Sequence, residues 1–132
     1  MPTITFSLND LQELIGKRLS IDELKELLFY CKAEFDGYDK ESDEVKADFG
    51  DTNLPYLWSV EGVARLLKGV LNLDKGIPNL KLNKADYKVI VDKSVKKIRP
   101  YIAAFVAKDQ MINEKLLMQM IQLQEKLCEN YG

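Results

Sequence analysis

Apolar residues recur with a helical period in four stretches of the chain, and each stretch begins with a capping signal. A side chain that can cap a helix precedes each run, and an apolar pair flanks it at the spacing of a hydrophobic staple. Glu23 adds a capping box to the second run, and Gly16 marks the end of the first. The pattern therefore predicts four helices, capped by Ser7, Ser20, Ser59 and Asn113.

Apolar and polar residues alternate in other stretches, which is typical of a strand buried on one face. Residues 3–6 and 45–49 alternate in this way, and a further strand is predicted at residues 33–36, followed by a turn over residues 36–43. Later in the chain, residues 87–91 alternate again. Residues 101–107 are apolar throughout, which predicts a strand covered on both faces.

Gly76 and Pro78 interrupt the pattern and mark a boundary between two parts. The expected fold class is α+β. Residues 1–73 are predicted to form a small three-helix domain with a short antiparallel sheet. Residues 74–86 form a linker, and residues 87–132 supply two strands and a long helix, a thin and incomplete second part.

Charge divides the chain in nearly the same place. Residues 1–74 hold 8 lysines and arginines against 15 acidic residues, whereas residues 75–132 hold 11 against 6. The basic part suits a phosphate backbone or an acidic partner. Neutralisation of the acidic part within the folded protein is an equally open interpretation, since the net charge is only −2.

The chain contains no histidine, which excludes Ser-His-Asp and Cys-His catalysis and imidazole metal sites within it. No glycine-rich phosphate loop occurs, and no carboxylates form a convincing catalytic pair. Cys31 and Cys128 are expected to be buried. We therefore expect no catalytic, cofactor-binding or metal-binding residue. No stretch resembles a signal peptide or a membrane span, so a cytoplasmic location is predicted.

A basic run offers the best candidate for a phosphate contact. Lys93, Lys96, Lys97 and Arg99 lie close enough to form one patch, and Tyr101 follows at a position where it could stack on a base. Four positive charges are few for RNA binding, so a solvated turn is the competing interpretation.

The most distinctive segment is residues 57–65, which contains the single tryptophan, Trp58. Trp58 opens a helix as a large apolar staple residue. Gly62 has no side chain in the first turn, so another backbone could approach closely there. Packing within the domain explains Trp58 well, and explains Gly62 and Arg65 less well.

Residues 51–65, which read DTNLPYLWSVEGVAR, resemble the N-R-P-D-L-x-S-x-E-G-x-A-R signature of the β subunit of phenylalanyl-tRNA synthetase. The opening MPTI is similar to the start of that subunit in archaea and eukaryotes. Lys97-Ile98-Arg99-Pro100-Tyr101 is similar to its I-R-P-[YF], and residues 121–127 are similar to its I-Q-L-Q-E-K-L. The four matches follow the family's order and span nearly the whole chain.

The resemblance implies a non-catalytic N-terminal segment of that subunit: a B1 domain and the start of the B3/B4 editing module. It implies a heterotetramer of two α and two β subunits, with the α subunit, the remainder of the β subunit and tRNA(Phe) as partners. ATP and Mg²⁺ would bind outside these residues. The candidate inter-domain or subunit contacts are Asn53, Pro55, Trp58, Gly62 and Arg65. Leu54 and Tyr56 depart from the family, which usually has Arg and Asp there.

Two other hypotheses remain. One is a free-standing RNA-binding or trans-editing protein derived from the same subunit, which should be basic overall, unlike this chain. The other is a hydrolase with an unrecognised carboxylate site, which should show paired, perturbed acids.

Overall fold

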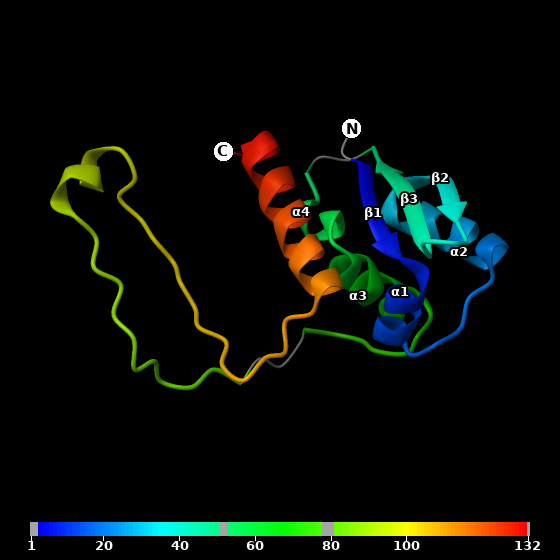
Figure 1. The fold of residues 1–132 in the computed structure, drawn as a ribbon, viewed down its shortest axis with the longest axis horizontal. Helices are drawn as coiled ribbons and strands as arrows, with labels where there is room; N and C mark the ends of the chain where they lie inside the picture. The colour runs from blue at the N-terminus through cyan, green and yellow to red at the C-terminus, as the bar shows by residue number, and fades with distance from the viewer. Residues whose placement is uncertain (1–2, 51–52, 78–80, 132) are drawn as a thin grey trace. The chain divides into compact units, whose positions relative to one another are not determined.

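A computed structural model describes residues 3–50, 53–77 and 81–131 of the chain. It divides into two compact units, Met1–Gly76 together with Asn113–Gly132, and Ile77–Ile112 (Figure 1). Met1, Pro2, Asp51, Thr52, Pro78 and Gly132, which carried parts of the sequence prediction, lie outside the described residues. In chain order the elements are β1 (Thr3–Ser7), α1 (Leu8–Ile15), α2 (Ile21–Leu28), η1 (Phe29–Cys31), β2 (Ala33–Asp39), β3 (Glu44–Phe49), η2 (Pro55–Trp58), α3 (Val60–Val70), η3 (Lys93–Lys97) and α4 (Glu114–Tyr131).

All four predicted helix starts are confirmed. The Ser7 and Ser59 hydroxyls accept hydrogen bonds from backbone amides three residues later, at 3.1 and 3.2 Å. Ser20 and Glu23 form the complete capping box. The Asn113 side chain accepts from the Leu116 amide at 2.8 Å. These contacts satisfy amides that have no partner within the helix, which is why short polar side chains fix the starts.

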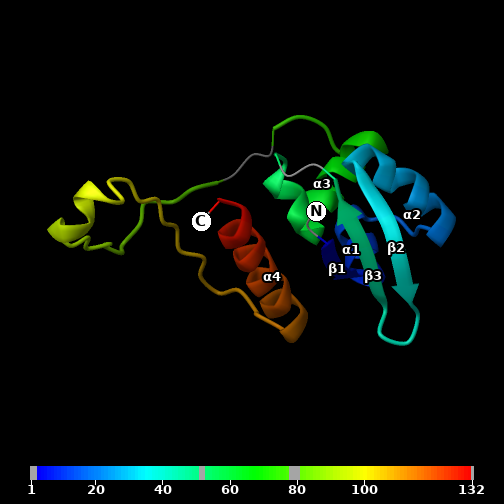
Figure 2. The same cartoon turned by 90° about the horizontal axis from the view of Figure 1, so that it is seen from above.

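The three strands form one antiparallel sheet in the order β1-β3-β2. β2 is longer than predicted. It continues to Asp39, so the turn covers only residues 40–43 rather than 36–43. A register shift between Phe35 and Gly37 makes a β-bulge in β2. The sheet places its apolar residues on one face, against the helices (Figure 2).

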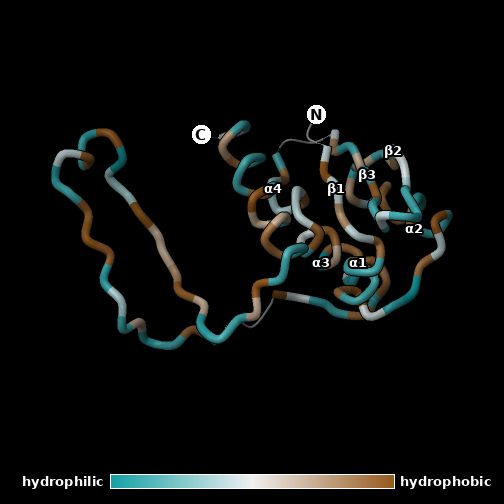
Figure 3. The backbone as a smooth tube through the Cα atoms, in the orientation of Figure 1, coloured by the Kyte–Doolittle hydropathy of each residue, from teal (hydrophilic) through white to brown (hydrophobic). Residues whose placement is uncertain are grey.

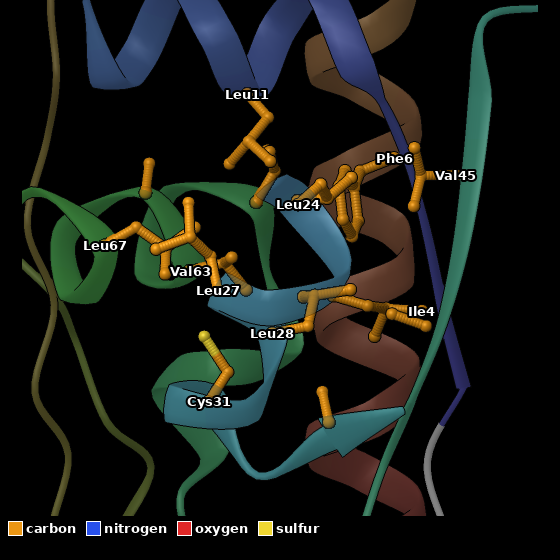
Figure 4. Close-up of a cluster of buried hydrophobic side chains, with 14 of the residues drawn as sticks. Ile4, Phe6, Leu11, Leu24, Leu27, Leu28, Cys31, Val45, Val63 and Leu67 are labelled. Atoms are coloured by element: carbon orange, nitrogen blue, oxygen red, sulfur yellow. The ribbon is translucent and has the colours of Figure 1, made fainter. Parts of the chain in front are cut away.

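One hydrophobic core holds the first unit together. Side chains from α1, α2, α3 and the sheet converge on it, as Figure 4 shows for ten labelled residues. Trp58, Phe49 and Ile4 are among the largest fully buried side chains. The three-helix domain with a short sheet is therefore confirmed.

α4 belongs to the first compact unit, whereas the sequence assigned it to the second part. None of its residues 114–129 is buried, and Leu123 alone among them packs against the core cluster. Cys128 is exposed, so the prediction that both cysteines are buried was right for Cys31 and wrong for Cys128.

The segment Ile77–Ile112 contains no strand in its described residues, so the strands predicted at 87–91 and 101–107 are absent. Its one regular element is η3. Apolar residues are spread along the whole segment (Figure 3), and Ile90, Tyr101 and Phe105 are among the most exposed. A strand needs a neighbouring strand for its backbone hydrogen bonds, and a doubly covered strand needs two layers above and below it. Residues 81–112 lack both.

Candidate interaction sites

The glycine of the Trp58 segment is fixed by a backbone contact. A Cβ on Gly62 would lie 1.5 Å from the carbonyl oxygen of Tyr56, so η2 and the first turn of α3 approach each other at a distance that only glycine permits. The predicted close approach is thus confirmed. Trp58 is fully buried in the core. Trp58 and Gly62 therefore act inside the unit, and their sequence-based role as outward contacts does not fit their burial.

The other residues of this segment form its outer surface. Asn53 and Arg65 are exposed, Pro55 is half-buried, and Tyr56 is 48% exposed. Leu54, half-buried, packs against the core cluster. Leu54, which stands where the family usually has arginine, therefore makes an apolar contact with the core. Tyr56, which stands where the family usually has aspartate, places an aromatic ring on the surface.

The basic run lies on η3 and immediately after it. Lys93, Lys96, Lys97 and Arg99 are all exposed. Lys93 and Lys96 are three residues apart, and such residues eclipse in a 3₁₀ helix and project from one face. Asp92 caps the turn, and hydrogen bonds from the side chain and the amide of Ser94 hold the pKa of its carboxyl below the ordinary value. Tyr101 is 94% exposed. All four cationic side chains therefore face water, and their union in one phosphate-binding patch stays a prediction.

A polar cluster that the sequence did not reveal fixes the start of α1. The Asp43 carboxylate accepts from the Ser7 hydroxyl and from the Asn9 amide, and the Tyr38 hydroxyl donates to it at 3.4 Å. Burial opposes ionisation of Asp43, but the hydrogen bonds from Ser7 and Asn9 outweigh it and hold its pKa below the ordinary value. Asp43 sits in the β2–β3 turn, so this cluster ties the turn to the helix.

An open groove of about 660 Å³ lies between β1 and α4. Its lining includes Phe6, Met118 and Ile121 together with the acidic Glu44 and Glu125. Inside it, the Gln122 carboxamide accepts from the Thr5 amide at 2.8 Å and donates to the Thr5 carbonyl at 3.1 Å. No local signal could have found this contact, because 117 positions separate the two residues.

The described part of the chain holds no metal-binding cluster and one buried thiol. Within residues 3–50, 53–77 and 81–131, no group of three or more acidic, cysteine or histidine side chains could hold a metal ion. Burial raises the pKa of Cys31 to about 12, which keeps it a thiol. Across the same residues no helix is long and apolar enough to cross a membrane.

The chain is similar over its whole length to known proteins. It is 42% identical over 134 residues to the "Phenylalanine--tRNA ligase beta subunit" of Thermococcus kodakarensis, and 42% identical over 137 residues to that of Borreliella burgdorferi. Each match covers 100% of this chain, which spans only about a quarter of each relative, 23% and 24%. No protein-family model matches the sequence.

A solved structure is similar as well. The crystal structure of an N-terminal fragment of the phenylalanyl-tRNA synthetase β subunit from Pyrococcus horikoshii matches with a TM-score of 0.85 and 40% identity. The match covers 99% of this chain and 38% of that fragment. Nearly all of the segment Ile77–Ile112 therefore lies within the aligned region.

Proposed function

We propose that this chain, which is homologous over its full length to the N-terminal part of the β subunit of phenylalanyl-tRNA synthetase, is a scaffolding module in the aminoacylation of tRNA(Phe). In this proposal the first compact unit is a self-contained structural domain. The segment Ile77–Ile112 docks on strands and helices that the remainder of the β subunit supplies. The chain itself contributes no catalytic group.

The observation that carries the proposal is the exposed apolar surface of the segment. Isolated apolar side chains on a surface are ordinary, but a continuous apolar run in water is unfavourable and marks an interface. The segment exposes many large apolar side chains, and Ile90, Tyr101, Phe105 and Met111 are each 90% exposed or more. The Pyrococcus horikoshii fragment, in which the matched part is 38% of the whole, has additional protein that can cover the equivalent run.

The remaining partners are part of the same proposal. The α subunit would carry the aminoacylation site, so ATP and Mg²⁺ would bind outside these residues. The exposed Asn53 and Arg65 and the half-buried Pro55 are the candidates for contacts with the rest of the synthetase. Lys93, Lys96, Lys97 and Arg99 are the candidates for a contact with a tRNA phosphate backbone. Exposed cations can neutralise phosphates and so release the counterions condensed on the RNA.

The test is a complementation of two pieces. A Thermococcus kodakarensis β subunit that lacks the aligned N-terminal region is co-expressed with its α subunit and with this chain. We expect the chain to co-purify with them, and the amides of Ile77–Ile112 to become protected from hydrogen exchange. Absence of binding would contradict the proposal.

Matched variants show whether the segment carries the binding. Ile90→Asp with Phe105→Asp places two charges in the segment and should abolish co-purification. Phe29→Asp with Tyr30→Asp alters two aromatic residues of the first unit that are 82% and 63% exposed, and should leave binding intact. If the two double variants behave alike, the segment is not the docking element.

An activity assay addresses the non-catalytic part of the proposal. The isolated chain should support neither phenylalanine-dependent ATP–pyrophosphate exchange nor deacylation of mischarged tRNA. Either activity, if it were lost on substitution of acidic residues of this chain, would favour an enzyme instead.

A further inference from the structure

The sheet of the first unit has two edge strands, and they are protected in different ways. β2 carries three carboxylates, Glu34, Asp36 and Asp39, and a β-bulge. Charges and bulges both discourage another strand from pairing at an edge. β1 reads Thr-Ile-Thr-Phe-Ser and has no charge, proline or glycine. Its edge therefore needs a cover from elsewhere in the protein.

Gln122 of α4 provides that cover, and α4 lies alongside β1 (Figures 1 and 2). Its single carboxamide bonds both backbone groups of Thr5, accepting from the amide at 2.8 Å and donating to the carbonyl at 3.1 Å. A residue on a neighbouring antiparallel strand makes the same pair of hydrogen bonds. The side chain of Gln122 thus takes the place of a strand.

The attachment of α4 is mostly polar. Gln119 donates to Asp10 at 2.6 Å, and the Lys115 ammonium lies 3.5 Å from the Ser7 hydroxyl. Residues 115, 119 and 122 share one helix face. Burial of apolar surface is the main source of stability, and none of residues 114–129 is buried. α4 is therefore the helix of the first unit that leaves the sheet at the least cost.

We propose that the edge of β1 is a pairing site for β1 of a second copy of this chain, and that Gln122 keeps this site closed. The Thr5 amide and carbonyl face the edge, and the Thr3 backbone and the Ser7 amide face the same way, because hydrogen-bond direction alternates along a strand. A two-fold axis at Thr5 brings Thr5 opposite Thr5 of the second copy.

This pairing is self-complementary. With the axis at Thr5, Thr3 of one copy lies opposite Ser7 of the other, and no charged residue of β1 meets a like charge. Threonine and serine pairs across strands are favourable. The same patch on both copies forms the contact, which is the arrangement of a closed dimer, and the two sheets become one continuous sheet.

The first experiment removes the cover. Gln122→Ala deletes both hydrogen bonds to Thr5, and sedimentation velocity at several protein concentrations measures self-association. We expect the association constant of the dimer to be at least about tenfold higher than for the unsubstituted chain, because two hydrogen bonds that compete with pairing are lost. Gln124→Ala is the matched control, because Gln124 is an exposed glutamine of the same helix. It should change nothing.

The second variant restores protection without α4. In Thr5→Glu, the new carboxylate lies opposite Lys46 of the same sheet, which favours the folded monomer. In the proposed dimer, the carboxylates of the two copies would face each other at the two-fold axis and repel. The double variant Gln122→Ala/Thr5→Glu should return to a monomer. Association that survives Thr5→Glu runs through another surface and overturns the proposal, as does a Gln122→Ala chain that stays monomeric.

Hydrogen exchange at the Thr5 amide tests the cover independently of association. The amide of residue 5 should exchange slowly in the unsubstituted chain. Between the two variants that carry glutamate at this position, it should exchange faster in monomeric Gln122→Ala/Thr5→Glu than in Thr5→Glu alone. Equal rates in the two variants would mean that Gln122 does not close the edge, and the proposal would fail.

Discussion

The first compact unit and the segment Ile77–Ile112 both carry many large apolar side chains, and they place them in opposite ways. The first unit buries twenty apolar residues in one cluster, most of them large, while the segment leaves Ile90, Tyr101 and Phe105 almost fully in water. The first unit contains its own sheet and the helices that cover it, so its apolar residues meet one another. The segment has apolar residues without a second layer. Apolar content alone therefore does not make a domain; the chain must also supply both sides of the core.

The sharpest test of this comparison truncates one phenylalanine in each region. Phe49 is 1% exposed, so Phe49→Ala should lower the free energy of unfolding by about 3–5 kcal/mol. Phe105 is 90% exposed, so Phe105→Ala should stay within about 0.5 kcal/mol. Urea unfolding followed by the fluorescence of Trp58 measures both. A large loss from Phe105→Ala would mean that the segment has a packed core of its own.

A second test concerns the tightest backbone contact of the first unit. Gly62→Ala adds a Cβ 1.5 Å from the Tyr56 carbonyl oxygen, so η2 or α3 must move. We expect a loss near or above the upper end of the roughly 1–3 kcal/mol that overpacking costs.

Gly69→Ala is the matched control for that contact. Its Cβ would lie 3.9 Å from the nearest atom outside the helix, and alanine favours a helix over glycine. Thermal unfolding should show a lower midpoint for Gly62→Ala and an unchanged or higher one for Gly69→Ala. Equal effects would contradict the close approach.

A smaller effect should come from the polar cluster at Asp43. The pKa of Asp43 is lowered in the folded protein, so its contribution to stability is complete above its unfolded value of about 3.8 and is lost as the pH falls through the lower folded value. Asp43→Asn should cost about 1 kcal/mol at neutral pH. Asparagine tolerates the positive φ of 59° at this position.

The pH dependence separates that effect from a general loss of packing. Unfolding curves of the two proteins should converge as the pH drops below 3.8. Glu41→Gln, in the same turn and exposed, serves as the control and should match the unsubstituted chain at every pH. A difference between Asp43→Asn and the unsubstituted chain that persists in acid would assign the effect to something other than the charge.

The smallest effect is chemical and leaves stability unchanged. Cys31 is 1% exposed with its pKa raised to about 12 by burial, whereas Cys128 is exposed on α4. A thiol reagent at neutral pH should label Cys128 in the folded chain and Cys31 only after unfolding, which mass spectrometry can follow. Labelling of Cys31 in the folded state would show that the core opens on the time scale of the reaction.

The sequence predicted the local features of the fold because those features depend on neighbouring residues. Ser7, Ser20, Ser59 and Asn113 bond amides only three residues away. The alternation of apolar and polar residues also predicted β1 and β3 correctly, because one face of each strand packs on the core. Gly62 was identified for the same reason, since the residue it contacts, Tyr56, is only six positions away in the sequence.

Features that depend on distant residues could not be predicted in this way. The contacts Gln122–Thr5 and Asp43–Ser7 join residues 117 and 36 positions apart, and neither residue type signals its partner. The strands expected at 87–91 and 101–107 have the right pattern, but the pattern does not say whether a neighbouring strand is present. For α4, the apolar stripe predicted a buried face, and the structure buries none of residues 114–129.

The contact between Gln122 and Thr5 has a consequence for the order of events during synthesis. β1 is synthesised before α4, and Gln122 follows Thr5 by 117 residues. At about 5–20 residues per second, the 73 residues from Phe49 to Gln122 take on the order of 4 to 15 s, during which β1 and β3 are made and the edge is open. Over that interval two chains on one messenger are held close together. The edge of β1 is thus most vulnerable to a neighbouring nascent chain before translation of α4 is complete.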